Sequence, residues 1–357
     1  MKIYKLLVTS ILALHASFTI SYGQSSSTAD FSFLTGSCAD IEVSLEDSSG
    51  VLYNGDTSIL YHMANMDSDF MLWLGDNWYL DYDEWGQPDS MRTKAREARS
   101  ARTVVWLKDK PTPEYAIWDD HDYGPNQSTK NFPLKQVSRE IFMNTWTDNP
   151  GYGEHNEGIY TSFRYNDVKF ILLDDRWWRD RDNLWAYKWW HPNKDKRMFG
   201  KQQMKWLKQQ LTSDTSTAFK FIVNGNQILN PWSESDGLIH YPIEYNELLD
   251  FIRNKNIPGV VFLTGDKHYS EIIRKERKGK YTLFEITVSP LTSSPSQAGG
   301  TERLNKYRVS GTLVETNNFA RISVTGEPGD RQLKVQFFDS NKRKVGEWQV
   351  SSTELHD

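Results

Sequence analysis

Acidic, amide, histidine and arginine side chains follow the short apolar runs of this chain, nearly always within two residues. The side chains in these positions are Asp76, Asp119 to His121, Asp174 to Arg176, Asn226 and Asp266. In open α/β sheets, ligands bind beyond the carboxyl ends of the strands. If the apolar runs are strands of such a fold, these side chains converge on one site, where their oxygen and nitrogen atoms can hold cations.

The segment from Gly75 to Tyr79 carries the first candidate metal ligands. Glycine permits a tight turn at the end of a strand, and the turn would point Asp76 into the site. The two oxygens of an aspartate can bridge two cations, and the phenolate of Tyr79 suits trivalent iron. The alternative is that Asp76 caps a helix and that Tyr79 is a half-buried packing residue.

A second group of candidates lies in the segment from Trp118 to Asn126. Consecutive ionisable groups directly after an apolar strand are costly unless they are solvated or bind a cation. Asp120 and Asn126 offer oxygens to a second cation, Asp119 is a further candidate for binding metal or substrate, and His121 is a candidate general acid. The alternative is a solvated acidic turn.

Asp266, His268 and Cys38 complete the candidate ligands. Asp266 and His268 are two residues apart and would share one face of an extended segment, as a metal-ligand pair or as a pair on the surface of a strand. The thiolate of Cys38 would be a soft ligand for iron or zinc. Taken alone, Cys38 is more simply interpreted as a buried, unreactive cysteine.

Arginine and amide side chains add candidates for binding substrate. Arg176 presents the planar fork that binds phosphate oxygens, or it is a surface arginine paired with a neighbouring aspartate. Asn226 and Gln227 offer amide oxygens to a metal, or they merely end a strand. The tryptophans between residues 177 and 190 suggest a lid or a carbohydrate platform, but we expect a loop that packs on itself.

Strands that alternate with helices along the chain predict a layered α/β domain. Strands are predicted over residues 31–37, 70–74, 115–118, 168–173, 219–223 and 260–263. Helices are predicted over residues 91–107, 136–146, 201–211 and 244–254. A hairpin turn is expected at 164–168, surface loops at 149–158 and 177–198, and closing antiparallel strands at 311–325, 332–338 and 344–350.

The chain of 357 residues begins with a basic, then apolar, then small-residue pattern over residues 1–23, which predicts a secretory signal peptide. A linker at 24–30, one domain at 31–350 and a short tail at 351–357 would follow. We therefore expect a periplasmic or secreted protein without a stable membrane anchor. The net charge of −5 argues against a nucleic-acid-binding face, and one cysteine excludes an intramolecular disulfide.

Taken in order, several segments resemble the PhoD-like alkaline phosphatase D family of the calcineurin-like metallophosphoesterases. They are GSCAD at 36–40, LGDNWY at 74–79, WDDHDYGPN at 118–126, LDDR at 173–176, GNQ at 225–227, TGDKHYSE at 264–271 and FEITVSPLTSS at 284–294. The resemblance extends over about residues 31–350 and implies a four-layer αββα sandwich with two or three metal ions. The GDxxY piece also resembles purple acid phosphatases, which lack the cysteine and the DDH segment.

This resemblance implies a distribution of ligands between two kinds of cation. The residues that would surround a ferric ion are Cys38, Asp76, Tyr79, Asp266 and His268. The residues that would bind a divalent ion, expected to be calcium, are Asp76, Asp120 and Asn126, with Asn226 or Gln227 as additional donors.

Together, the residues and the resemblance predict an exported metal-dependent phosphoesterase. It would hydrolyse phosphate mono- or diesters, of small molecules or lipid headgroups, through a hydroxide that bridges two cations. Arg176 would neutralise charge on the phosphoryl oxygens, and His121 would protonate the leaving alkoxide. One alternative is a phospholipase-D-like phosphodiesterase of the same family. Another is a non-catalytic secreted protein that binds glycans or surfaces through its Trp-rich loop.

Overall fold

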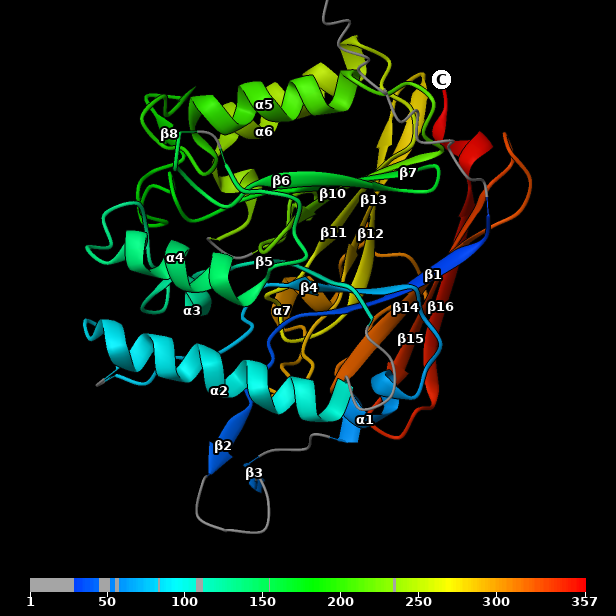
Figure 1. The fold of residues 1–357 in the computed structure, drawn as a ribbon. Helices are drawn as coiled ribbons and strands as arrows, with labels where there is room; N and C mark the ends of the chain where they lie inside the picture. The colour runs from blue at the N-terminus through cyan, green and yellow to red at the C-terminus, as the bar shows by residue number, and fades with distance from the viewer. Residues whose placement is uncertain are drawn as a thin grey trace, which may run out of the picture.

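The computed structural model describes residues 29–44, 52–54, 58–82, 84–106, 112–153, 155–233 and 236–357. The predicted signal peptide and nearly all of the predicted linker lie outside these residues. Two six-stranded sheets pack face to face, and helices lie on the outer sides of the pair (Figure 1). The α/β class is therefore confirmed.

The first sheet has the strand order β16-β15-β14-β1-β4-β5. Its strands are β1 (Phe31–Gly36), β4 (Phe70–Leu74), β5 (Glu114–Ile117), β14 (Asn318–Thr325), β15 (Gln332–Asp339) and β16 (Lys344–Ser351). Strands β1, β4 and β5 are parallel, and the closing strands β14, β15 and β16 are antiparallel, as predicted. Strand β14 begins later than predicted because the preceding segment pairs elsewhere: Val314 exchanges two backbone hydrogen bonds with Ser270.

The second sheet has the order β12-β13-β11-β10-β7-β6. Its strands are β6 (Thr161–Tyr165), β7 (Val168–Leu172), β10 (Phe219–Asn224), β11 (Val260–Thr264), β12 (Glu271–Arg277) and β13 (Lys280–Thr287). Four central strands are parallel, and the predicted hairpin joins β6 to β7. The β12–β13 hairpin is not in the sequence prediction, because charged residues interrupt the apolar pattern of β12.

Helices flank both sheets. They are α1 (Ser58–Ala64), α2 (Pro88–Trp106), α3 (Asp120–Tyr123), α4 (Lys135–Thr145), α5 (Gly200–Thr212), α6 (Pro242–Asn254) and α7 (Gly300–Arg303), with 3₁₀ turns η1 (Leu238–His240) and η2 (Ser352–Leu355). The four long helices agree with the sequence prediction. Figure 1 shows α5 and α6 outside the sheet that contains β6 and β7, and α1 and α2 outside the sheet that contains β4 and β5.

Aromatic rings fill the space between the two sheets. Phe33 of β1 lies 5.3 Å from Phe170 of β7 and 5.8 Å from Phe221 of β10, measured between ring centroids, and both contacts are edge-to-face. Phe70 of β4 contacts Phe170 and Phe163 in the same way, at 5.4 and 5.9 Å. Such contacts between inner faces are the core of a β-sandwich and fix how the two sheets align.

Two short two-stranded sheets lie outside the sandwich: β2 (Glu42–Ser44) with β3 (Leu52–Asn54), and β8 (Tyr187–Lys188) with β9 (His191–Pro192). The expectation that the tryptophans of residues 177–190 pack within their own loop is wrong for three of them. Trp177 is buried, but Trp185, Trp189 and Trp190 are 81%, 91% and 95% exposed. A two-residue hairpin turn holds Trp189 and Trp190 away from the body of the loop.

A buried lysine on β10 faces away from the space between the sheets. Phe221, its neighbour in the strand, points into the aromatic core, so Lys220 points to the opposite face. Lys220 is 1% exposed, and this burial lowers its pKa to about 8. The charged amine therefore destabilises the fold at neutral pH.

We expect Lys220→Met to raise the free energy of unfolding at pH 7. The native pKa of about 8 lies below the unfolded value, so the wild type regains stability as pH rises from about 8 to about 10.4. The gain from the substitution should be about 3 kcal/mol below pH 8 and should fade over that window. Urea unfolding at several pH values measures it. A gain that persists unchanged above this window would contradict the explanation.

Lys169 on the neighbouring strand β7 provides a matched control. Its ammonium group donates to the carbonyl of Gln210, at 2.9 Å, and to the hydroxyl of Ser213, at 2.8 Å, at the end of α5. Lys169→Met removes these two short hydrogen bonds along with the charge, whereas the ammonium group of Lys220 has a single long one, to the carbonyl of Pro258 at 3.5 Å. We therefore expect a smaller gain than for Lys220→Met, or a loss of stability.

Candidate metal centre

The ends of parallel strands from both sheets meet at one place. The backbone of Cys38, after β1, donates to the carbonyl of Gly75, after β4, at 3.2 Å. Gly265, after β11 in the other sheet, lies so close to the first sheet that an added Cβ would be 2.6 Å from the side chain of Ser37. Only glycine permits this approach, and it brings the polar residues that follow the strands of both sheets together.

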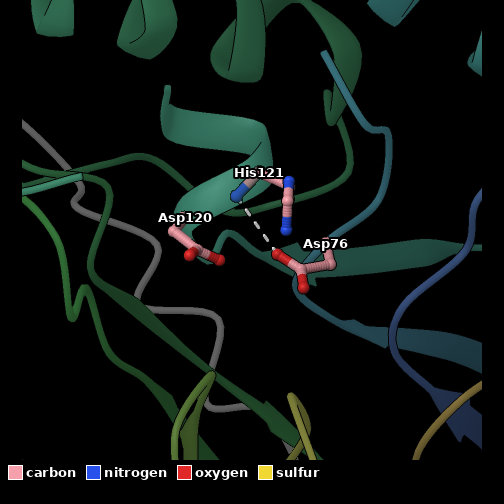
Figure 2. A group of neighbouring side chains, drawn as sticks. All are labelled: Asp76, Asp120 and His121. Carbon is pink, nitrogen blue, oxygen red and sulfur yellow. Dashed lines mark hydrogen bonds between the residues drawn. The ribbon is translucent and has the colours of Figure 1, made fainter. Parts of the chain in front are cut away.

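Asp76 lies at the centre of the candidate ligands. Its Oδ2 is 3.6 Å from the sulfur of Cys38 and accepts a hydrogen bond from the hydroxyl of Tyr79 at 3.3 Å. Its Oδ1 accepts from the backbone N–H of His121 at 3.2 Å, the bond drawn in Figure 2. The ring centroids of Tyr79 and His121 are 4.1 Å apart. Asp76, Cys38, Tyr79 and His121 therefore form one contact group.

Two groups of side chains in the described part of the chain are close enough to hold a metal ion. The first contains Asp76, Asp120 and His121, and the second contains Asp76, Asp119 and Asp266; within each, the ligand atoms lie within 4.8 Å of one another. Figure 2 shows the side chains of the first group facing a common space. Asp76 belongs to both groups, which is the arrangement that a carboxylate bridging two cations requires.

Apart from Asp119, the members of both groups line a cavity of about 410 Å³. The sequence-predicted residues on its wall are Asp76, Asp120, His121, Asn126, Asp266 and His268. Its wall also includes Asp236, which the sequence analysis did not single out. Asp236 is 7% exposed and lies in a loop after β10, where no apolar run precedes it to mark it.

The backbone is unusual at four of the candidate ligands. Cys38, Asp76, Asp266 and His268 have φ angles of 55°, 51°, 68° and 54°. The expectation that Asp266 and His268 occupy an extended segment is therefore wrong, although both still line the cavity. Residues other than glycine rarely adopt this left-handed conformation, and such residues cluster at functional sites.

A buried ion network lies beside the two groups. The guanidinium of Arg176, which is 0% exposed, donates to Oδ1 of Asp119 through two nitrogens, with Nε at 2.6 Å. It also lies 3.7 Å from Asp175 and 3.9 Å from Asp120. Arg176 thus balances the charge of these carboxylates, and it is neither a surface arginine nor part of the wall of the cavity.

The amide candidates are already hydrogen-bonded to protein groups. The amide oxygen of Asn226 accepts from Arg176 at 3.2 Å and from Arg179 at 2.8 Å. The amide of Gln227 donates to Glu271 at 2.8 Å, and its oxygen accepts from Asn230 at 2.9 Å. The structure therefore ties Asn226 into the arginine network and directs Gln227 away from the carboxylate groups.

Asp122 fixes the position of the ligands without being one of them. One of its oxygens accepts from the backbone N–H of Asn77 at 2.8 Å, and the other accepts from that of Asp119 at 2.9 Å. These bonds join the turn after β4 to the start of α3, so Asp76 and Asp120 are held in register. The sequence signal for Asp122 is its place in the acidic run, but its role depends on this contact between separate segments.

The electrostatics of the site favour a bound cation. Burial, together with the charges of Asp120, Asp122 and Asp266, raises the pKa of Asp76. Burial and the charge of Asp76 raise the pKa of the Cys38 thiol and of the Tyr79 hydroxyl. Burial lowers the pKa of His121, which keeps its imidazole neutral, and its Nδ1 is a buried atom without a hydrogen-bond partner. Carboxylates and a neutral imidazole around uncompensated negative charge fit a metal ion.

None of the helices among the described residues has both the length and the apolar character that crossing a bilayer requires.

Comparisons with known proteins point to one family. Alkaline phosphatase D of Bacillus subtilis is 26% identical over 254 residues, which cover 58% of this chain and 42% of that protein. The chain thus spans less than half the length of this relative. A solved structure of PhoD matches with a TM-score of 0.67 at 18% identity, over 91% of this chain and 72% of the other.

A purple acid phosphatase from yellow lupin seeds shares the fold at lower similarity. The TM-score is 0.57 at 12% identity, over 90% of this chain and 54% of the other. The model of the PhoD-like phosphatase family matches residues 33–337, which is most of the chain. The protein belongs to the PhoD-like phosphatase family.

Proposed function

We propose that the protein is a metal-dependent phosphoesterase that hydrolyses phosphate mono- or diesters. The observation that carries the proposal is Asp76, which lies on the wall of the cavity and belongs to both groups of side chains that could hold a metal ion. Family membership supports the same reaction class. The substrate class is a phosphate ester, either a small molecule or a lipid headgroup.

The two groups have the donor set of a centre for two cations. Bound cations would lower the pKa of a coordinated water and offset the negative charge of the phosphoryl group. Asp76 holds the two groups together, because its oxygens face both of them. His121 lies on the wall of the cavity, where its protonated imidazolium form would donate a proton to the departing oxygen of the ester.

Turnover of two chromogenic esters tests the proposal. The purified protein should hydrolyse p-nitrophenyl phosphate or bis-p-nitrophenyl phosphate, and a chelator should abolish the activity until metal is restored. Turnover that survives complete chelation would overturn a metal-dependent mechanism. Absence of turnover with native metal bound would favour a non-catalytic binding protein.

Export is part of the proposal and rests on the pattern of residues 1–23. N-terminal sequencing of the native protein should find a mature chain that starts near Gln24. A chain that still begins with Met1 would contradict export by signal cleavage.

We further propose that one of the cations is ferric iron and the other is calcium. The iron would be held by Cys38 and Tyr79 with Asp76, because thiolate and phenolate favour an oxidised iron. Asp120 and Asn126 present the oxygen donors that calcium prefers. The native protein should therefore be coloured, because both Cys38 and Tyr79 donate charge into ferric iron.

The absorption band of the native protein should shift in Tyr79→Phe and again in Cys38→Ser. Metal analysis of the same samples separates loss of iron from a change of its ligands. Tyr123 is a buried tyrosine of the same region that does not belong to the contact group around Asp76, so Tyr123→Phe is the matched control and should leave the band unchanged. A colourless but fully active enzyme would contradict the iron assignment and indicate a divalent ion in its place.

His121→Ala should reduce turnover in a way that depends on the leaving group. An alkyl ester needs a proton on its departing oxygen, whereas p-nitrophenolate does not, so we expect a loss of about 10²-fold or more for alkyl esters and a smaller loss for p-nitrophenyl esters. Asp76 and Asp120 keep their carboxylate oxygens for the cation of the first group, so metal content should stay near that of the wild type. Equal losses on both substrates would remove the general-acid role, and lost metal would place His121 among the ligands.

A further inference from the structure

The β8–β9 hairpin turns at two tryptophans, although both the backbone conformation and the exposure of these positions disfavour tryptophan. The pairs Tyr187–Pro192 and Lys188–His191 leave Trp189 and Trp190 as a two-residue turn. Their φ angles are 50° and 68°, the backbone that such turns require and that asparagine and glycine adopt most easily. Both side chains are more than nine-tenths exposed, so neither backbone preference nor burial explains them.

Hydrogen bonds to the body of the protein hold the root of this hairpin, so its exposed tip is part of an ordered element. Asp182 is held by the buried guanidinium of Arg179 at 2.7 Å, and the ammonium group of Lys196 donates to its carbonyl at 2.8 Å. Asn193 donates to the carbonyls of Ala186 and Trp185 across the two strands. Figure 1 shows β8 at the periphery of the molecule, beside α5.

The charges around the tip are predominantly basic. Lys188 forms an ion pair with Asp195 at 2.9 Å, and Asp182 is neutralised by Arg179, so both acids of the hairpin are compensated. Arg181 and Lys194 are exposed, and neither is in an ion pair with a described residue. The aromatic tip therefore has cationic flanks.

We propose that this hairpin, defined as residues 181–195, docks the protein onto the surface of an anionic lipid bilayer. The rings of Trp185, Trp189 and Trp190 would enter the region between headgroups and acyl chains, where tryptophan is most favourable because it is apolar with one polar N–H. Arg181 and Lys194 would face the anionic headgroups. The proposal does not depend on the reaction at the metal centre.

The shape of the tip favours a bilayer over a protein partner. Each tryptophan offers at most about 250 Å² of surface. The two tip residues together therefore fall short of the roughly 800 Å² per partner that a stable protein interface buries. A convex tip also fits a bilayer, which adapts to the side chains that enter it and requires no complementary pocket.

The hairpin root also adjoins the candidate metal centre. A cavity of about 690 Å³ is lined by Arg181, Asp182 and Asn183 and by residues 127–129, 131 and 132. Gln127 lines both this cavity and the cavity of the metal centre. Docking through the hairpin would therefore hold the cavity of the metal centre near the membrane surface.

Vesicle binding by the full protein tests the proposal. Flotation with vesicles of phosphatidylcholine and phosphatidylglycerol should recover the wild type with the lipid, less so at high salt. The double variant Trp189→Asn with Trp190→Gly should bind at least about tenfold more weakly. Because Asn-Gly suits this turn, the variant should unfold at the same or a higher temperature than the wild type.

Controls separate membrane docking from other causes. Tyr82→Ala removes an aromatic side chain that is 87% exposed and lies outside the hairpin, and it should bind vesicles like the wild type. Hydrolysis of a soluble p-nitrophenyl ester should be equal in all three proteins. The proposal is overturned if the wild type does not bind the vesicles or if the double variant binds equally well. It is also overturned if the hairpin tryptophans affect self-association or binding to soluble polysaccharide instead.

Discussion

Asp76→Asn should lose bound metal and reduce turnover by about 10³-fold or more, because the metal supplies both the nucleophile and the stabilisation of charge. The substitution keeps the size of the side chain but removes the negative charge that two groups of ligands share. An amide also offers one oxygen in place of two, so it cannot bridge two cations. Metal analysis and steady-state kinetics on the purified variant measure both effects.

Asp122→Asn is the matched control for Asp76→Asn. Asp122 is also buried and belongs to the same acidic cluster, but its oxygens accept backbone hydrogen bonds from Asn77 and Asp119. We expect this variant to lose stability while it retains most of its metal. Near-wild-type turnover of Asp76→Asn, or equal loss of metal in the two variants, would rule out Asp76 as the bridging ligand.

Arg176→Met should lower the free energy of unfolding by about 3–5 kcal/mol, the usual cost of removing one partner from a buried ion pair. The side chain of Arg176 is buried with Asp119 and Asp175, which would remain as buried carboxylates without their cation. The sequence alone suggested a role in substrate binding, for which stability would hardly change. Urea unfolding of the metal-free proteins separates the two roles.

Arg331 provides the control for the loss of a buried arginine in general. It is 0% exposed and pairs with Asp30 at 3.1 Å, near the start of β1 and the end of β14. Arg331→Met should lose stability without affecting metal content or turnover, whereas Arg176→Met should affect all three. If Arg176→Met keeps wild-type stability and loses only turnover, the guanidinium acts on substrate as the sequence suggested.

Local sequence patterns were sufficient for the elements and for most of the candidate ligands. Apolar runs located six of the strands to within about two residues, because a buried strand must be apolar along its length. Gly75 followed by Asp76 marked a turn at a strand end, and φ of Gly75 is 93°. The pattern failed at β12, whose outward-facing residues are charged, and at Asp266, whose backbone is left-handed.

The sequence by itself determined which donors are present and that they follow strands, since these properties depend on residue type and local pattern. Only the tertiary structure decided which donors meet. It placed Asp76 between two groups of ligands, buried Arg176 against Asp119 and turned the amide of Gln227 towards Asn230. The reason is physical: the segments lie tens to more than a hundred residues apart, and their distances follow from the packing of two sheets through a shared aromatic core.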